Sequence, residues 1–353
     1  MHEFSYDFIK NQIMTANLFS VSNIITDLKE KTLNRKQNGS NLFKKLETIA
    51  IKDSVEASNA IEGIYTTENR IEEIVDNNSK PLTHDEEEIA GYKDAIIFIK
   101  NNYEYLSFNE ETIKKLHSML FSRHIGSHKG GEYKKEDNII AERNKNGSIK
   151  KVIFRTTPAK DVEKQMKDFV LAYQVARDDY EIPALLLIPC VIVDFLAIHP
   201  FQDGNGRLSR LLTLLLLFKE GIDIGKYISF EKMINEYKSN YYEALQSSQH
   251  LWHENKCNYQ PFIIFTFQII YECYKKINER FLILTKNKMS KKEIIEETIR
   301  QSLVPISKDE IHNLFPDISI TTIEVELVNL QKLNKISKIG TFKNAKYIYL
   351  KNN

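Results

Sequence analysis

Apolar residues recur close to the helical period along most of the first 285 positions, which predicts a mainly α-helical protein. Asn38-Gly39-Ser40 interrupts this spacing, as a glycine within a polar segment does between two helices. Asn109 is a suitable N-cap for the helix expected at 109–121, because its short side chain can accept a backbone N–H. The expected helices cover residues 1 to about 50 with the break at 38–40, then 42–60, 68–77, 85–102, 109–121, 159–177, 182–198, 206–219, 230–248 and 261–284.

The pattern changes between residues 127 and 156. Two short apolar runs, 139–141 and 151–154, flank Lys145-Asn146-Gly147-Ser148. Asn-Gly is a preferred pair for a two-residue β-turn because both residues tolerate a positive φ. We therefore predict a β-hairpin here, with an irregular basic loop as the alternative.

The last part of the chain predicts a separate small domain. Residues 285–290 form a polar stretch typical of a linker, and three short helices are expected at 291–303, 307–315 and 319–333. Alternating residues at 336–339 and 346–350 then predict two strands joined across Gly340-Thr341. This order is similar to that of a winged helix, whose third helix often enters the DNA major groove.

The third helix of this domain carries little positive charge. Thr321 or Thr322 lies near its expected cap, Glu324 and Glu326 follow, and the first lysine is Lys332. Contacts of basic side chains with phosphates dominate DNA affinity, so that affinity is expected to be weak. We favour a role in protein contact or dimerisation over DNA binding.

Composition excludes several classes of protein. The 353 residues contain 49 Lys plus Arg and 48 Asp plus Glu, so a net charge of +1 gives no general attraction to nucleic acid or membranes. The longest apolar run, residues 211–218, is too short to span a bilayer. Cys190, Cys257 and Cys273 fit neither a metal site nor a disulfide framework. With no signal peptide at the start, a reducing cytoplasm is the expected location.

The most informative segment is residues 199–210, His-Pro-Phe-Gln-Asp-Gly-Asn-Gly-Arg-Leu-Ser-Arg. The apolar run that follows it predicts a loop that tightens into the N-terminus of a buried helix. Helix N-termini present free N–H groups and a partial positive charge, and therefore bind anions. Glycines let the backbone approach a phosphate without a Cβ in the way.

Charged side chains complete this site. Arg207 and Arg210 are three residues apart, so both can face one polyphosphate with bidentate donors. Asp203 offers a hard oxygen ligand for Mg²⁺, and His199 has the ordinary pKa of a general base near neutral pH. The segment therefore predicts a site for a magnesium–nucleotide beside a base that can activate a nucleophile.

This segment resembles the signature of the Fic family, His-x-Phe-x-(Asp/Glu)-Gly-Asn-Gly-Arg-x-x-Arg, at every defined position. Most members transfer AMP from ATP to a Ser, Thr or Tyr hydroxyl of a protein, a few move other phosphate-linked groups, and at least one branch removes AMP. The resemblance implies a helical Fic core at 111–285, preceded by a helical region at 1–110 and followed by the winged-helix-like domain at 290–353.

The resemblance also implies a role for each motif residue. His199 would deprotonate the target hydroxyl, Asp203 would hold Mg²⁺, and Phe201 would pack in the core and lock the loop. The phosphate ligands would be Gly204, Asn205 and Gly206 around the α- and β-phosphates, Arg207 on the β-phosphate and Arg210 on the γ-phosphate. Tyr241 and Tyr242 are candidates for the adenosine pocket, with ordinary core packing of either one as the alternative.

The predicted hairpin would be the Fic flap, which covers the active site. In the family it docks the main chain of the target as an added strand, near residues 139–156 here. Residues 131–134, Gly-Glu-Tyr-Lys, carry Lys134 where many members have arginine, so the way this flap is anchored is not implied by the resemblance.

A second motif, Ser58-Asn59-Ala60-Ile61-Glu62-Gly63, precedes the core. It resembles the inhibitory motif (Ser/Thr)-x-x-x-Glu-(Gly/Asn) of class II members. Ser58 and Glu62 lie four apart on one helical face, a spacing that alone indicates only solvated surface. In the family context, Glu62 would form a bidentate pair with Arg210 and so occupy the γ-phosphate arginine, while Ser58 would position the glutamate.

The predicted function is an autoinhibited protein adenylyltransferase that uses ATP and Mg²⁺ to modify a hydroxyl of a target protein and of itself. Two alternatives remain. One is a hydrolase that removes AMP at the same site, with Glu62 orienting a water. The other is a regulator that senses nucleotide and binds DNA through its last domain. Because family members often dimerise, a homodimer is also expected.

Overall fold

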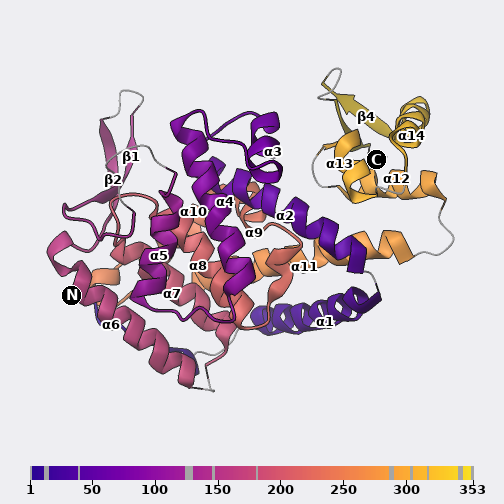
Figure 1. Cartoon of the computed structure of the whole chain (residues 1–353). Helices are drawn as coiled ribbons and strands as arrows, with labels where there is room; N and C mark the ends of the chain where they lie inside the picture. Colours follow the sequence, from indigo (N-terminus) through magenta and orange to yellow (C-terminus); the bar gives the residue numbers. More distant parts are fainter. Residues whose placement is uncertain are drawn as a thin grey trace. The chain divides into compact units, whose positions relative to one another are not determined.

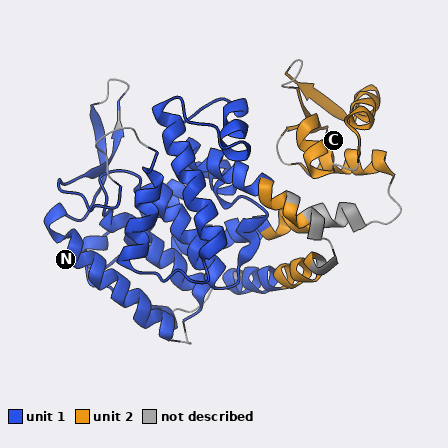
Figure 2. Cartoon of the chain, in the orientation of Figure 1, with its two compact units in different colours: residues 1–26, 49–273 blue, residues 27–48, 274–353 orange. Residues whose placement is uncertain are grey.

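The computed structural model describes residues 2–11, 16–38, 40–123, 130–144, 148–179, 182–285, 290–302, 305–315, 318–340 and 345–350. These residues are mainly helical, as the sequence predicts. The chain divides into two compact units, one of residues 1–26 and 49–273 and the other of residues 27–48 and 274–353 (Figure 2).

The first unit surrounds the motif with helices, and a two-stranded hairpin projects from it (Figure 1). Its elements, with helices that continue into the second unit included, are η1 (Asp7–Asn11), α1 (Ala16–Asn38), α2 (Ser40–Ile61), α3 (Glu68–Asp76), α4 (His84–Asn102), α5 (Glu110–Leu120), β1 (Ile139–Arg143), β2 (Ile149–Arg155), α6 (Ala159–Asp178), α7 (Ala184–Ile198), α8 (Asn205–Lys219), η2 (Asp223–Lys226), α9 (Phe230–Glu236), α10 (Lys238–Gln249), η3 (Trp252–Glu254) and α11 (Gln260–Thr285).

Helices α7 and α8 form the centre of this unit, packed against one another and contacted by α4, α5, α6 and α10. Every residue of α7 from Leu186 to Ile198 is buried, and so is every residue of α8 from Arg207 to Phe218. Residues 211–218 of α8 are apolar on all sides except at Thr213, and a helix of this kind is stable when it is buried. The apolar run 211–218 therefore fixes the buried position of α8, and the motif at its N-terminus is fixed with it.

Two details of the helices differ from the sequence prediction. Residues 230–248 form two helices, because the chain bends at Tyr237, which has φ −110° and ψ 31°. The buried positions keep a near-helical spacing across the bend, so the pattern did not reveal it. The helix expected from residue 319 begins one residue later, as α14 (Ile320–Lys332), because Ser319 is its cap and accepts the Thr322 N–H. Asn109 caps α5 as predicted, by accepting the Thr112 N–H.

The predicted hairpin is confirmed. β1 and β2 pair in antiparallel fashion, with irregularities of register after Ile140 and after Glu142. Such bulges bend and twist a strand pair. Residues 145–147 of the expected turn lie outside the described residues.

The second unit contains α12 (Lys291–Gln301), α13 (Lys308–Leu314) and α14 (Ile320–Lys332). Its strands are β3 (Ile306–Ser307), β4 (Ile336–Ile339) and β5 (Lys346–Tyr349), in the antiparallel order β3-β5-β4. The sequence predicted β4 and β5 but missed the two residues of β3, which are too few to show an alternating pattern. Residues 286–289 of the expected linker and residue 341 of the turn lie outside the described part. In the part of the chain that the structure describes, no helix is both long and apolar enough to cross a membrane.

A buried carboxylate fastens the N-terminal segment to α7. Asp194 is 1% exposed and accepts hydrogen bonds from Tyr6 Oη at 2.8 Å, Trp252 Nε1 at 2.8 Å and Tyr259 Oη at 2.7 Å. Burial is the main cause that raises the pKa of Asp194, and the three donors act against it. These three hydrogen bonds fix α7 at a position five residues before His199.

We expect Asp194→Ala to lower the free energy of unfolding by about 3 kcal/mol, because it leaves three buried donors without an acceptor. Asp194→Asn keeps one acceptor oxygen and should cost about 1 kcal/mol. Urea denaturation measures both. Asp168→Ala, at an exposed position of α6, is the control and should change stability by less than about 0.5 kcal/mol. Equal stability of the Asp194 and Asp168 alanine variants would contradict this account.

Candidate active site

Helix α7 delivers His199 at its C-terminal end. The residue adopts a left-handed conformation, with φ 52°, while its N–H still donates to Phe195 O at 2.9 Å. Pro200 cannot continue the helical hydrogen bonds, so the chain leaves the helix there. The imidazole therefore lies where the buried helix becomes the motif loop.

The loop is braced by the side chain of Asn205, the first residue of α8. Asn205 Oδ1 accepts the Phe201 N–H at 3.0 Å, and Asn205 Nδ2 donates to Phe201 O at 2.8 Å. Phe201 itself is fully buried, as predicted. Gly204 precedes the helix with φ 77°, and a Cβ there would press on the Phe121 ring. The side chain of Asn205 thus fixes the shape of the loop by bonding to both backbone groups of Phe201.

His117 on α5 is a site residue that sequence reasoning missed. The Gly131 N–H donates to His117 Nδ1 at 2.8 Å, so the hydrogen of the neutral ring lies on Nε2, which is 2.9 Å from Asp203 O. The ring also stacks on Phe201, with centroids 3.7 Å apart. The imidazole therefore ties the motif loop to α5. Its only signal in the sequence is a buried position in the α5 pattern.

His199 is held as a neutral imidazole. Burial and, second, the Lys134 ammonium lower the pKa of His199 to about 4. Its Nδ1 lies 3.4 Å from Leu196 O, a carbonyl that can only accept, so Nδ1 carries the hydrogen. The lone pair on Nε2 remains available to take a proton, as a general base requires.

Lys134 anchors the flap to the motif loop. Its buried ammonium donates to Asn138 Oδ1 and Thr156 Oγ1, both at 2.8 Å, and lies 3.4 Å from Ile198 O. Asn138 directly precedes β1 and Thr156 directly follows β2, so one amine joins both ends of the hairpin to the residue before His199. Burial lowers the pKa of Lys134 to about 8.

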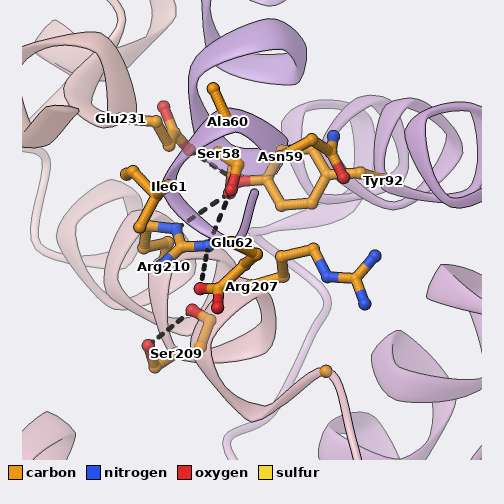
Figure 3. A network of polar contacts seen from close by, with 12 residues as sticks. Ser58, Asn59, Ala60, Ile61, Glu62, Tyr92, Arg207, Ser209, Arg210 and Glu231 are labelled. Atoms are coloured by element: carbon orange, nitrogen blue, oxygen red, sulfur yellow. Dashed lines mark hydrogen bonds and ion pairs between the residues drawn. The ribbon is translucent and has the colours of Figure 1, made fainter. Parts of the chain in front are cut away.

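Arg210 and Glu62 form the ion pair that the inhibitory motif predicts. Arg210 Nη2 lies 2.8 Å from Glu62 Oε1 (Figure 3). The guanidinium is almost completely buried, whereas the Glu62 side chain is 33% exposed. A Cβ added to Gly206 would overlap the Glu62 carboxylate, so this carboxylate lies against the first turn of α8. An anionic side chain thus occupies the helix N-terminus where a phosphate is expected.

The contacts of this group differ from the expected ones in two respects. Glu62 reaches Arg210 through one oxygen only, so the pair is not bidentate. Ser58 bonds to the arginine and not to the glutamate: Ser58 Oγ accepts from Arg210 Nε at 2.8 Å, and Ser58 O accepts from Nη2 at 2.9 Å. The serine occupies Nε–H and one N–H of Nη2, and the carboxylate takes the other N–H of Nη2.

The end of α2 fixes where Glu62 lies. Gly63 has φ 84°, the Ile64 N–H donates to Asn59 O at 3.0 Å, and the Gly63 N–H donates to Ala60 O at 3.2 Å. This is the Schellman arrangement that glycine favours after a helix. Lys238 Nζ also donates to Ile61 O at 2.7 Å. Glu62 is therefore the last residue before the chain turns away.

Arg207 lies apart from Arg210. Its buried guanidinium forms an ion pair with Glu88 of α4 and lies 5.5 Å from the centre of the Phe121 ring. In Figure 3 the two arginine side chains point in different directions. The structure therefore does not bring both guanidinium groups to one face, and the role of Arg207 on the β-phosphate stays a prediction.

Asp203 is the residue that fits a magnesium ion. Its side chain is 67% exposed, and Oδ1 accepts the Gly204 N–H at 2.6 Å. Among the described residues no group of three metal-binding side chains occurs. A single exposed carboxylate beside the expected phosphate site would suit Mg²⁺, which takes most ligands from phosphates and water, and Mg²⁺ binding by Asp203 stays a prediction. A cleft of about 420 Å³ opens beside Asp203, between His117, Tyr133 and Lys134.

The two tyrosines of α10 differ in position. Tyr241 is buried, packs on Phe262 and Phe265, and has its hydroxyl next to Arg210. Tyr242 is 43% exposed and meets Tyr241 edge to face. Core packing thus accounts for Tyr241, while Tyr242 keeps an open face. Adenosine binding by either residue stays a prediction.

The motif region also matches known proteins. A model of the Fic/DOC family matches residues 107–217. A Fido domain-containing protein of Dictyostelium discoideum is 31% identical over 127 residues, which cover 34% of this chain and 80% of that protein. The chain belongs to the Fic/DOC family.

Solved structures of Fic proteins share the fold at low identity. A Fic family protein of Desulfovibrio desulfuricans has a TM-score of 0.61 at 17% identity, over 97% of this chain and 98% of that one. A Fic domain-containing signaling protein of Bacteroides thetaiotaomicron has a TM-score of 0.59 at 19% identity, over 71% of this chain and 95% of that one. In this Fic protein, Ser58, Glu62 and Tyr242 lie outside the stretch that the family model matches.

Two neutral imidazoles make the stability of this Fic protein depend on pH. Burial is the largest cause that lowers the pKa of His117, and also that of His199, from 6.5 to about 4. Between pH 6.5 and 4 the unfolded chain binds more protons than the folded one. Stability is therefore complete above pH 6.5 and is lost as the pH falls toward 4.

We expect His117 alone to account for a loss on the order of 2 kcal/mol over this range. His117→Gln should be less stable at pH 7.5 but should flatten the profile, because glutamine does not titrate. Urea unfolding at pH 7.5, 6.0 and 5.0 measures the slope. His250→Gln, at an exposed position, should leave it unchanged. A slope for His117→Gln equal to that of the native protein would contradict this assignment.

Proposed function

We propose that this protein is an autoinhibited adenylyltransferase that transfers AMP from ATP to a hydroxyl of a protein. One observation carries the proposal: the Glu62 carboxylate lies against Gly206 and on Arg210, at the N-terminus of α8. A site that attracts one carboxylate by helix dipole and guanidinium is suited to phosphate oxygens as well. The neutral imidazole of His199 precedes the same turn by five residues.

The reaction follows from these groups. Nε2 of His199 takes the proton of the target hydroxyl while the hydroxyl oxygen bonds to the α-phosphorus of ATP. The bond from the α-phosphorus to the bridging oxygen breaks, and pyrophosphate leaves with the electron pair. The N–H groups of Asn205 and Gly206 in the first turn of α8 stabilise the charge that develops on the phosphate oxygens. Asp203 would hold Mg²⁺, which when bound neutralises charge on the phosphates.

Inhibition rests on competition for Arg210. The buried guanidinium has one N–H directed to Glu62, and a γ-phosphate would require the same donor and the same space. ATP can then bind only with its phosphates displaced from the in-line position. Removal of the Glu62 carboxylate should open the site.

We propose that the target protein pairs with the flap. β1 and β2 form a two-stranded sheet in the described residues, and Ile149 and Ile153 of β2 are exposed. A hairpin of this kind can accept an extended segment along a free edge. Lys134 would keep such a segment close to His199, because it joins both ends of the hairpin to Ile198.

For the second unit we propose protein contact. The exposed side of α14 carries Val325 and Val328, and its Glu324 is paired with Lys308. This surface offers apolar area and little free positive charge, which suits a protein better than DNA. A salt-dependent gel shift of DNA by the whole protein would contradict it.

We expect Glu62→Gly to raise self-modification by about tenfold or more, the effect of freeing one charged hydrogen bond. Intact-mass spectrometry after incubation with Mg²⁺ and each nucleoside triphosphate measures the group gained, and AMP is expected from ATP. Glu62→Gln, which keeps the shape without the charge, should give an intermediate rate. Glu104→Gly, in the turn after α4, is the control and should match the native protein.

The double variant Glu62→Gly with His199→Ala tests the base. We expect it to show no modification above the native background, since no other group takes the hydroxyl proton. Modification as fast as in Glu62→Gly would show that His199 is not the base. No mass gain from Glu62→Gly with any triphosphate would overturn the transferase proposal.

A further inference from the structure

A chain of hydrogen bonds runs from Arg210 through Ser58 and Tyr92 to Glu231, next to the end of α2 (Figure 3). Arg210 Nε donates to Ser58 Oγ at 2.8 Å, the Ser58 hydroxyl is hydrogen-bonded to the Tyr92 hydroxyl, and Tyr92 Oη donates to Glu231 Oε1 at 2.8 Å. Ser58, Tyr92 and Glu231 are completely buried. Two hydroxyls thus connect a buried cation to a buried carboxylate.

The two ends give this chain a single direction. A guanidinium only donates hydrogen bonds and a carboxylate only accepts them, so each hydroxyl must accept from the arginine side and donate toward Glu231. Burial and the Glu231 carboxylate hold the pKa of Tyr92 well above its usual range, so its hydroxyl keeps the hydrogen. Hydrogen bonds aligned in this way polarise and strengthen one another.

Glu231 is held at its second oxygen as well. Ser229 Oγ donates to Glu231 Oε2 at 3.4 Å, and Ser54 Oγ donates to Ser229 Oγ at 2.9 Å. Ser54 and Ser58 are four residues apart and lie on one face of α2. Both oxygens of the carboxylate are therefore tied to the same face of this helix, which fixes their place relative to Arg210.

Glu62 is not a member of this chain of hydrogen bonds. Glu62 contacts Nη2 of Arg210, whereas Ser58 holds Nε through its hydroxyl and Nη2 through its carbonyl. When a nucleotide displaces Glu62, the contacts with Ser58, Tyr92 and Glu231 can remain. Arg210 would then keep a fixed orientation and a buried countercharge.

We propose that Tyr92 and Glu231 are positioning residues that orient the Arg210 guanidinium for the γ-phosphate, whether or not Glu62 is in place. The part of this inference that concerns the γ-phosphate rests on the proposed function. The part that concerns the orientation of Arg210 does not, and the two are tested separately.

The first experiment needs no nucleotide. Selective ¹⁵N labelling of arginine allows the exchange of the Arg210 Nε–H with water to be measured by NMR. Tyr92→Phe removes the hydroxyl that orders Ser58, and we expect exchange to become about tenfold faster or more. Tyr6→Phe is the matched control, because it removes a buried hydroxyl bonded to a different carboxylate, Asp194, also at 2.8 Å. Unchanged exchange in Tyr92→Phe, or an equal increase in both variants, would overturn the proposal.

The second experiment compares nucleotides in the Glu62→Gly background. Calorimetry with Mg²⁺ should show that adding Tyr92→Phe raises the Kd for ATP about tenfold but leaves that for ADP, which lacks the γ-phosphate, unchanged. Adding Tyr6→Phe should change neither. Glu231→Gln keeps an acceptor oxygen without the charge, and should give a smaller effect on ATP alone. Thermal unfolding of each variant identifies any general loss of fold.

Three outcomes would contradict the proposal. Equal weakening of ATP and ADP by Tyr92→Phe would indicate a role in folding only. Activation of the protein by Tyr92→Phe with Glu62 present would show that this chain of hydrogen bonds holds Glu62 in its inhibitory place and does not orient Arg210. Absence of ATP binding by Glu62→Gly would overturn the proposed function, while the exchange of the Arg210 Nε–H would still decide whether Tyr92 orients the arginine.

Discussion

The buried guanidinium of Arg210 needs partners on every side, because an unpaired charge in a protein interior is severely destabilising. The end of α2 supplies three of these partners, the Ser58 hydroxyl, the Ser58 carbonyl and the Glu62 carboxylate, and the Tyr241 hydroxyl of α10 is hydrogen-bonded to the same guanidinium. A helix far from the motif in sequence thus completes the motif. The helix that would inhibit the site is also the one that supports its arginine.

This double role explains why the Arg210 guanidinium has inner contacts with Ser58 and an outer contact with Glu62. Ser58 takes the inner edge of the guanidinium and is itself held by buried groups, whereas Glu62 is partly exposed and reaches one N–H. In the proposed mechanism the inner contacts would persist and only the outer one would be exchanged for a phosphate. A phosphate oxygen can replace a carboxylate at an exposed donor at little cost, since both are anionic acceptors.

The rest of the site is kept rigid by neutral groups. The amide of Asn205 and the imidazole of His117 brace the loop, and neither adds charge next to the proposed phosphate site. The cost is sensitivity to acid, because a protonated His117 could no longer accept the Gly131 N–H. Lys134 supplies a positive charge close to His199, which favours the neutral ring that a base requires.

The sequence by itself determined the helices, the hairpin and the motif chemistry. Apolar spacing, the cap at Asn109 and the Asn-Gly turn are local signals, and a fixed register of defined residues at 199–210 indicates the site without reference to the fold. The sequence also marked Glu62 as a partner for Arg210. It did not show the bend at Tyr237, because the buried positions keep their period through it, or the short strand β3.

Only the tertiary structure decided how these residues meet. Contacts between segments far apart in sequence leave no periodic trace, so the bonds of His117 to the loop, of Lys134 to both ends of the flap and of Glu231 to the arginine chain were not visible. It also decided that Arg207 pairs with Glu88, that Ser58 holds the arginine and not the glutamate, and that Tyr241 belongs to the core. A motif specifies which groups are present, but the direction of each side chain depends on the space and the partners that neighbouring helices provide.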